Sequence, residues 1–520
     1  MLASTSSGRA SNDVLNVLSS LEKLYSVAQS RQIDRAAAQL AACSGSVLME
    51  RAGAAAFAFL RGRWPQAQRL AVLCGAGNNG GDGYVLARLA HLAGWPVRLA
   101  AVAGPPRPGS EADTARQWFI ACGGAEESIS VATLAQADVV VDALLGTGLD
   151  RPPAGPVADA IAAIDASGRP VLALDVPSGL NADTGQAPGA LVRADATVSF
   201  VARKQGLYTG QARDCCGQLV FDDLGVPQQA LAQAGAAPAV LLDLPRLRAA
   251  WLPPRRRGAH KGDFGHVLVI GGDHGYGGAV RLAGEAAARA GAGLTSVATR
   301  PAHVPALLAG RPELMARGVD GAADLAPLLA RASVLALGPG LGQGDFGRAL
   351  FGAALGRGLP LVVDADALNL LAAAPERRAD WILTPHPGEA ARLLGITTAQ
   401  VEADRYGAVR ALQARFGGVV LLKGAGTLVC DGQAPVGVVP YGNPGMASGG
   451  MGDVLTGLIA GLWAQGLPAL AAAALGACLH AAAADALAAR RGERGLLACD
   501  VSAALPPLLN GMDDGAHLGA

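Results

Sequence analysis

The chain has 520 residues, of which 51% are hydrophobic and 16% charged, a composition that excludes an intrinsically disordered protein. A single hydrophobic core stops growing at roughly 250–300 residues, so this length predicts at least two domains. Basic and acidic residues number 42 each, and this balance gives no electrostatic basis for binding nucleic acid or an anionic membrane.

The eight cysteines are scattered without a C-x-x-C pair, which argues against a zinc site and a disulfide framework. Residues 1–23 begin Ser-rich and lack the apolar run of a signal peptide. We therefore expect a disordered tail over 1–23 and a cytoplasmic protein with reduced thiols. The apolar stretch Leu458–Leu479 is broken by Gln465, Gly466 and Pro468, so it predicts two buried helices and not a membrane span.

The N-terminal half alternates helices with short apolar strands. A helical pattern runs from Leu24, and a second helix is predicted with Ser46 as its N-cap. Leu70–Cys74 predicts a buried strand that leads into the glycine-rich segment 75–83 and a helix over 84–93. A strand, a glycine-rich turn and a helix in this order are typical of a phosphate-binding βα unit.

Further strands of this half are predicted at 97–102, 138–145, 171–174 and 197–200. The first of them ends without an acidic residue that could bind a ribose, and this disfavours an ordinary dinucleotide-dependent dehydrogenase.

Three strand ends of this half carry polar side chains. Asn79 and Asp82 follow the strand at 70–74, Asp142 lies near the end of the strand at 138–145, and Asp175 and Ser178 follow the strand at 171–174. In open α/β sheets such strand ends meet at one crevice, although each aspartate alone could simply cap a turn. Asn79, Asp142 and Ser178 offer only oxygen ligands, which suit a hard cation and not zinc.

Lys204 follows the strand at 197–200 and either faces this crevice or lies in solvent. Residues 226–260 then change character, first Ala-, Gln- and Pro-rich and later a Pro-Pro-Arg-Arg-Arg run. We place a linker there, between an N-terminal domain over 24–225 and a C-terminal domain over 261–512.

The C-terminal half repeats the alternation of strands and helices. Strands are predicted at 266–270, 334–337, 361–369, 381–384 and 419–422, with a β-rich edge over 427–439. No G-x-x-x-x-G-K-[ST] segment occurs, which excludes P-loop phosphate chemistry. His386 lies between two prolines, where it either contacts a ligand or is a buried structural histidine. Lys423 precedes a glycine and either reaches nucleotide phosphates or lies at the strand edge.

The most informative segment of this half is Asn443–Asp453, where glycines precede an apolar helix. Glycine amides and a helix N-terminus form an anion-binding site, with the carboxylate of Asp453 at its edge. This arrangement indicates phosphoryl transfer to a hydroxyl, with Asp453 as the base; a purely structural turn is the alternative. Because a helix N-terminus lowers a carboxylate pKa, we expect Asp453 to be ionised and a weak base.

These residues resemble a known family, that of fused NAD(P)H-hydrate repair enzymes. The motifs that carry the resemblance are Asn78–Gly83, Asp142–Gly148, Asp175–Gly179, Gly338–Gly342, Thr384–Glu389 and Ser448–Asp453. The resemblance implies an α/β chain with an N-terminal Rossmann-like three-layer domain of YjeF type, followed by a ribokinase-like α/β domain. It further implies that the first domain epimerises R- and S-NAD(P)H hydrate and the second dehydrates the S form, cleaving ADP to AMP and phosphate.

The resemblance also assigns residues. The epimerase site would comprise Asn78, Asn79, Gly80, Gly81, Asp82, Gly146, Thr147, Gly148, Leu149, Asp150, Arg151, Pro152 and Asp175, with K⁺ at Asn79, Asp142 and Ser178. In the dehydratase, Ala279, Gly340, His386 and Asp453 would contact the hydrate, and Lys423, Gly424, Ala425, Gly426, Thr427 and Gly452 the nucleotide. Asp453 and Asp175 would be catalytic, and Lys204 is a weaker candidate.

The implied cofactors are K⁺ for the epimerase and Mg²⁺ with ADP for the dehydratase. The implied partners are NADHX, NADPHX and ADP, with no nucleic acid and no membrane, in a homo-oligomer. Two other functions compete with this one: a ribokinase-like kinase of a vitamin precursor alcohol, and an N-terminal half that only binds nucleotides.

Overall fold

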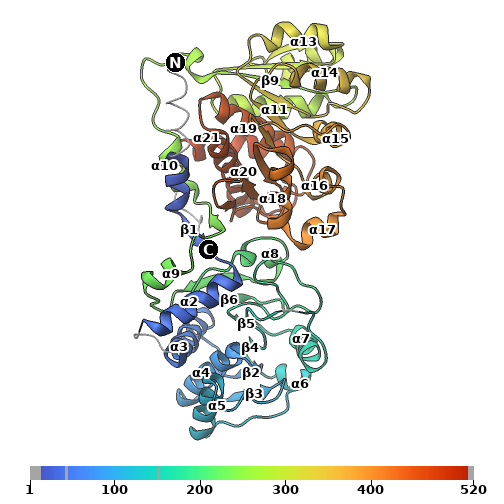
Figure 1. The fold of residues 1–520 in the computed structure, drawn as a ribbon. Coiled ribbons are helices and arrows are strands. Elements are labelled where there is room, and N and C mark those ends of the chain that lie inside the picture. Colours follow the sequence, from blue (N-terminus) through green and yellow to red (C-terminus); the bar gives the residue numbers. More distant parts are fainter. Residues whose placement is uncertain (1–12, 41–44, 150, 513–520) are drawn as a thin grey trace. The chain divides into compact units, whose positions relative to one another are not determined.

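The computed structural model describes residues 13–40, 45–149 and 151–512. The chain forms two compact units, one spanning Lys23–Pro238 and the other comprising the chain from Ala239 onward together with the segment before Lys23. Each unit is a β-sheet covered by helices (Figure 1), which confirms the predicted α/β class.

The N-terminal unit contains a parallel six-stranded sheet in the order β3-β2-β4-β5-β6-β7. Its strands are β2 (Leu70–Cys74), β3 (Val97–Ala101), β4 (Val139–Ala143), β5 (Val171–Leu174), β6 (Ala196–Phe200) and β7 (Gln218–Asp222). The helices around it are α2 (Val27–Gln39), α3 (Gly45–Arg63), α4 (Asn78–Leu92), α5 (Glu111–Ala121), α6 (Val131–Leu134), α7 (Pro156–Ser167), α8 (Ala212–Cys215) and α9 (Gln228–Gln233). A 3₁₀ turn, η1, covers Gln205–Tyr208.

Successive side chains of the central strand β4 point to opposite faces of the sheet, and helices cover both faces, so the unit has three layers. Val139 and Val141 join the apolar cluster that contains residues of α2 to α5, whereas Val140 joins the cluster that contains Ile161 and Ile164 of α7. Strands buried on both faces are expected to be continuously apolar, as these are.

Three helix starts of this unit differ from the predictions. The helix expected from Leu24 begins at Val27, after an N-cap at Ser26, and Ser46 lies inside α3. α4 begins at Asn78, so the segment predicted as a turn is already helical. The reason is close packing: a Cβ at Gly80 would overlap the backbone carbonyl of Gly75, so glycine lets the helix start directly against the strand end.

The second sheet has eleven strands in the order β1-β8-β17-β16-β15-β14-β13-β12-β9-β10-β11. These strands belong to the C-terminal unit, except that β1 includes Lys23 and Leu24 from the start of the N-terminal unit. The strands of this sheet are β1 (Glu22–Leu24), β8 (Ala239–Leu241), β9 (His266–Ile270), β10 (Leu294–Thr299), β11 (Met315–Gly318), β12 (Val334–Leu337), β13 (Leu361–Val363), β14 (Trp381–Leu383), β15 (Val419–Leu422), β16 (Leu428–Cys430) and β17 (Val436–Val438). The strands from β11 to β15 are parallel along this order, and β16 is antiparallel to both neighbours.

The α-helices of this unit are α10 (Leu244–Trp251), α11 (Gly277–Arg289), α12 (Val304–Gly310), α13 (Ala322–Leu329), α14 (Asp345–Leu355), α15 (Ala365–Ala373), α16 (Pro387–Leu394), α17 (Thr398–Ala403), α18 (Arg405–Phe416), α19 (Met451–Ala464), α20 (Ala469–Arg491) and α21 (Ala498–Leu509). Short 3₁₀ turns lie at Lys261–Phe264, Pro301–His303 and Pro444–Met446.

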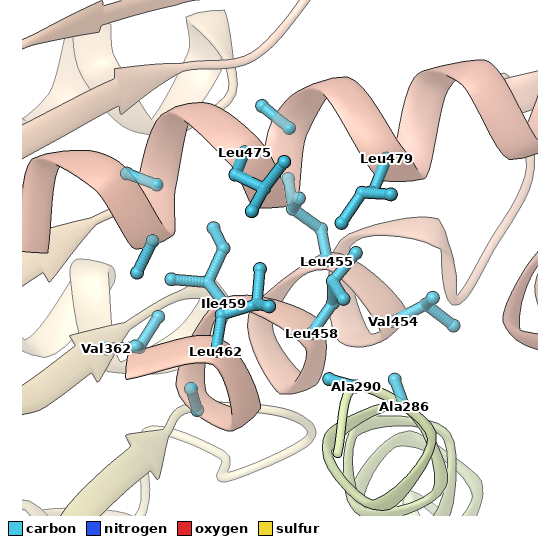
Figure 2. Close-up of a cluster of buried hydrophobic side chains, with 14 of the residues drawn as sticks. Ala286, Ala290, Val362, Val454, Leu455, Leu458, Ile459, Leu462, Leu475 and Leu479 are labelled. Atoms are coloured by element: carbon cyan, nitrogen blue, oxygen red, sulfur yellow. The ribbon is translucent and has the colours of Figure 1, made fainter. Parts of the chain in front are cut away.

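Helix α19 lies at the centre of this unit's core. Figure 2 shows its leucine, isoleucine and valine side chains between α11, α20 and Val362 of β13. A Cβ at Gly457 would overlap the backbone of Ala283, so the missing side chain lets α19 and α11 pack closely. α20 is long and apolar enough to cross a membrane by composition alone, but 83% of its apolar window is buried within the protein. The predicted pair of buried helices is confirmed.

The predicted tail and linker need correction. Residues 13–19 are helical, and Val14, Leu18 and Leu21 join the core of the C-terminal unit. Val14 and Leu18 are four residues apart and so lie on one face of this helix, a pattern that the Ser-rich start of the chain obscured. The segment predicted as a linker over 226–260 is structured too: it holds α9 of the N-terminal unit, and β8 and α10 of the C-terminal unit.

We expect Leu18→Ala to destabilise the C-terminal unit by about 2 kcal/mol or more, because truncating a buried leucine leaves a cavity. In scanning calorimetry this variant should lower the transition of the C-terminal unit, whereas Leu172→Ala in β5 should lower that of the other unit. Asn16→Ala, at an exposed position of the same helix, should shift neither. If Leu18→Ala and Leu172→Ala acted on the same transition, residues 13–22 would not belong to the C-terminal core.

Candidate active sites

A cavity of about 780 Å³ lies at the carboxyl ends of the parallel strands in the N-terminal unit. The predicted residues that line it are Asn78, Asn79, Asp82, Gly146, Thr147, Gly148 and Asp175. These residues come from three strand ends, so the described structure brings together the polar side chains that the sequence distributes over nearly 100 positions.

The other predicted residues of this site lie elsewhere. Gly80 and Gly81 are buried in the first turn of α4, where Gly81 lies against Met49. Leu149, Arg151 and Pro152 do not line the cavity, and Asp150 lies outside the described residues.

Asp175 and Lys204 form the charged centre of this cavity. Lys204 is 2% exposed and donates hydrogen bonds to Asp175 and to the carbonyl of Phe200, the latter at 2.7 Å. Lys204 therefore faces the crevice and not the solvent. Asp175 has a positive φ of 62°, a conformation that costs energy for a residue other than glycine. Strain at a charged residue inside a cavity is typical of functional sites.

Two further carboxyl groups face this pair. Burial raises the pKa of Asp82 well above its usual value, and the nearby Asp175 and Asp34 add to the effect. Burial also raises the pKa of Asp34 to about 6, whereas Lys204 opposes that shift. Our sequence analysis missed Asp34. Its position on the buried face of α2, four residues after Ser30, is the signal that could have found it.

The residues predicted to bind K⁺ lie at the same strand ends. Asp142 is fully buried and accepts hydrogen bonds from the hydroxyl of Ser178 at 2.6 Å and from its backbone N–H at 2.8 Å. Burial raises the pKa of Asp142 to about 6. Within the described residues, neither polar atom of the buried Asn79 amide has a hydrogen-bond partner. An unpaired buried amide is costly, so it indicates a place for a ligand.

In the C-terminal unit, a buried ion pair connects several strand and helix ends. Lys423, after β15, donates to Asp364 Oδ1 at 2.7 Å, and Thr456 of α19 donates to Asp364 Oδ2 at 2.8 Å. A Cβ at Gly452 would lie 3.3 Å from Asp364 Oδ2 and 3.4 Å from Lys423 Nζ. Gly452 thus borders the ammonium group that was predicted to reach nucleotide phosphates.

Asp453 lies in the first turn of α19, as predicted, but its expected low pKa is wrong. Burial raises the pKa of Asp453 to about 7, the charge of Asp364 adds to this effect, and Lys423 opposes it. The cost of desolvating the carboxylate outweighs the helix dipole. Asp453 is consequently a stronger base than the helix position alone implies.

His386 is the N-cap of α16. Its Nδ1 accepts hydrogen bonds from the backbone N–H groups of Gly388 at 3.0 Å and Glu389 at 3.3 Å. Because Nδ1 is an acceptor, the ring proton of the neutral imidazole lies on Nε2. Burial and the nearby Lys423 lower the pKa of His386. The half-exposed ring can therefore offer a ligand a hydrogen-bond donor.

Ala279 and Gly340 lie next to each other, at the start of α11 and after β12. A Cβ at Gly340 would come 2.5 Å from Cβ of Tyr276 and 3.3 Å from Cβ of Ala279. The backbone carbonyl of Gly340 accepts a hydrogen bond from Asp273 N–H at 2.6 Å, which ties the two loops together.

Comparison with known proteins covers both units. A family model described as NAD(P)H-hydrate dehydratase matches residues 267–507, and one described as YjeF-related protein N-terminus matches residues 45–206. The bifunctional NAD(P)H-hydrate repair enzyme Nnr of Coxiella burnetii is 50% identical over 496 residues, which cover 94% of this chain and 99% of the relative. The enzyme of the same name from Escherichia coli is 45% identical and covers 92% of both chains.

The chain belongs to the family of bifunctional NAD(P)H-hydrate repair enzymes. The resemblance noted in the sequence is thereby confirmed, with a YjeF-type domain before an NAD(P)H-hydrate dehydratase domain. Several solved structures each match about half of this chain. An ADP/ATP-dependent NAD(P)H-hydrate dehydratase from Bacillus subtilis, co-crystallised with ATP/Mg²⁺, is 28% identical, with a TM-score of 0.46 over 52% of this chain and 98% of its own.

Proposed function

We propose that this protein repairs hydrated NAD(P)H in two steps. The N-terminal unit interconverts the R and S forms at C6 of the nicotinamide ring, and the C-terminal unit converts the S form to NAD(P)H with cleavage of ADP to AMP and phosphate. The observation that carries this proposal is the similarity across both units to a bifunctional repair enzyme, at 50% identity over 94% of the chain.

In the dehydratase, the C6 hydroxyl is a poor leaving group until it is phosphorylated. Asp453 takes the hydroxyl proton while the hydroxyl oxygen attacks the terminal phosphorus of ADP and AMP departs. The lone pair of the ring nitrogen then expels phosphate, and loss of a proton from C5 completes the double bond of NAD(P)H. The raised pKa of Asp453 supports its role as the base near neutral pH.

The nucleotide would lie on Lys423 to Thr427, beside Gly452. Lys423 keeps its charge, because Asp364 and Glu389 raise its pKa against the effect of burial, and a charged ammonium suits a diphosphate. The described residues include no group of three acidic, histidine or cysteine side chains that could hold a metal ion. Mg²⁺ would therefore arrive with the nucleotide phosphates and neutralise their charge.

In the epimerase, Asp175 and Lys204 are the proposed acid–base pair. Lys204 holds the carboxylate of Asp175 by a direct ion pair, and both line the cavity together with Asn79 and Gly146. The missing side chain of Gly146 leaves room beside Asp175 Oδ2, 3.4 Å from where a Cβ would lie. The hydrate ring would occupy this space.

We propose that K⁺ binds Asn79, Asp142 and Ser178. The unpaired amide of Asn79 and the buried carboxylate of Asp142 supply oxygen donors, and a hard monovalent cation would satisfy both. A bound K⁺ would stabilise negative charge at these strand ends. Asn79 and the 144–148 segment, which line the cavity, would then surround the hydrate.

Asp453→Asn should abolish the return of NAD(P)H from S-hydrate and leave epimerisation intact, because the two sites lie in separate units. R- and S-hydrate would be mixed with protein, Mg²⁺, K⁺ and either ADP or ATP, and each epimer followed by chromatography. Loss of both activities in this variant would contradict independent sites. A stable phosphorylated alcohol without NAD(P)H would identify a kinase instead, and unconsumed R-hydrate would identify a binding-only N-terminal unit.

The rate of dehydration should fall as the pH falls through about 7, because Asp453 must be ionised to accept a proton and its pKa is raised to about 7. Below this value, kcat/KM for S-hydrate should decrease about tenfold per pH unit. Asp364→Asn removes a negative charge that raises the pKa of Asp453, so its profile should shift to lower pH. The titration of ADP itself is the same with wild type and with Asp364→Asn. If the pH profile of the variant did not shift, Asp453 would be excluded as the titrating group.

Asn79→Ala should raise the K⁺ concentration for half-maximal epimerisation by roughly tenfold or more, since one ligand to the ion is lost. K⁺ should also raise the melting temperature of the wild-type N-terminal unit more than that of the variant. Dehydration of S-hydrate is the internal control and should not change. Equal K⁺ dependence of variant and wild type would remove Asn79 from the proposed ligand set.

A further inference from the structure

Arg405, the first residue of α18, is a buried cation that the two candidate sites do not use. Its side chain is 1% exposed. Nη1 lies 3.2 Å from each carboxylate oxygen of Glu402, whose side chain is 36% exposed. Nη2 donates to the backbone carbonyls of Lys423 at 3.1 Å and Leu422 at 3.5 Å. Burying a guanidinium is costly unless hydrogen bonds compensate. Its bonds to the carbonyls of Leu422 and Lys423 therefore indicate that it stabilises the backbone at the end of β15.

The carbonyls that Arg405 binds mark the point where β15 ends and the turn of residues 423–427 begins. Lys423 lies beyond the strand, so its carbonyl has left the hydrogen-bonding pattern of the sheet. The guanidinium supplies the donor that the sheet no longer provides. It therefore fixes the direction in which the chain leaves the sheet.

Gly424 shows how closely the turn lies on the guanidinium. A Cβ at this position would be 2.8 Å from both Nη1 and Nη2 of Arg405, and the residue has a φ of 136°. Only glycine adopts this conformation readily and leaves space for the charged group. The glycine after Lys423 is thus explained by the arginine beneath it.

Lys423 is consequently held at both ends. Its carbonyl accepts a hydrogen bond from Arg405, and its ammonium group donates to Asp364 at 2.7 Å. Displacement of the carbonyl would move the start of the 423–427 turn, and with it the position from which the lysine side chain extends.

We propose that Arg405 is a positioning residue for the nucleoside diphosphate: from beneath the 423–427 turn, it sets the backbone that binds the phosphates and the origin of the Lys423 side chain. It touches neither substrate. The proposal rests on the function proposed for this turn, and it distinguishes the nucleotide from the hydrate, whose predicted contacts at Ala279, Gly340 and His386 do not involve Arg405.

The test compares Arg405→Met, Arg405→Lys and Gly424→Ala with wild type. Calorimetric titration with Mg·ADP gives the dissociation constant, and steady-state kinetics give KM for ADP and for S-hydrate. Arg405→Met should weaken Mg·ADP binding roughly tenfold or more, as expected for loss of charge-assisted hydrogen bonds, with KM for S-hydrate within about twofold. Arg405→Lys should restore part of the affinity. Gly424→Ala should give the same split, because its methyl group displaces the guanidinium.

Arg415→Met is the matched control, an exposed arginine in the last turn of the same helix whose guanidinium lies over the Phe416 ring at 5.3 Å. It should change neither constant. Equal weakening of ADP and hydrate binding, or none, would overturn the proposal; if Arg405→Met fails to fold, Arg405→Lys and Gly424→Ala decide. If wild type binds Mg·ADP but forms no NAD(P)H, the proposed function fails, while the role of Arg405 is still decided by the binding constants.

Discussion

Parallel strand pairing makes successive chain segments leave each sheet along the same edge, and both candidate sites depend on this constraint. In the N-terminal unit it brings Asn79 and Asp175 to one cavity and places the buried Asp142 at the same edge of the sheet. In the C-terminal unit it brings Asp364 after β13, His386 after β14 and Lys423 after β15 to one edge. The helices add the remaining groups, because α4 and α19 each begin with glycines close to these strand ends. The residues proposed to bind phosphate and hydrate are thus distant in sequence and close together in the fold.

Burial then determines the chemistry of these groups. A carboxylate removed from water holds its proton more tightly unless a cation or donor compensates. Asp364, paired with Lys423, keeps a lowered pKa, whereas Asp453, which lacks so direct a partner in the described structure, has a pKa raised to about 7. Neighbouring carboxylates in one site therefore differ in proton affinity, one remaining charged and the other able to accept a proton.

Apolar runs and strand-end motifs made most of the fold predictable. β2, β5, β9, β12 and β15 have the predicted limits because each is a short apolar run. β10 was missed because Thr295, Ser296 and Thr299 are buried within it and make it read as polar. Asp34 and Arg405 were also missed, because each lies on a helix and reaches its site only through tertiary packing. The pKa of Asp453 was mispredicted because local helix position says nothing about desolvation.

The placement of residues 13–22 in the core of the C-terminal unit has a consequence for biosynthesis. Ribosomes release a protein from its first residue, and domains usually fold in that order. Here residues 13–22 join a core that also contains residues of α20 and α21, which are translated much later. The N-terminal unit can fold before the C-terminal helices have been translated. Until then Val14, Leu18 and Leu21 lack the core that buries them. The core of the C-terminal unit is therefore completed only after α20 and α21 have been translated.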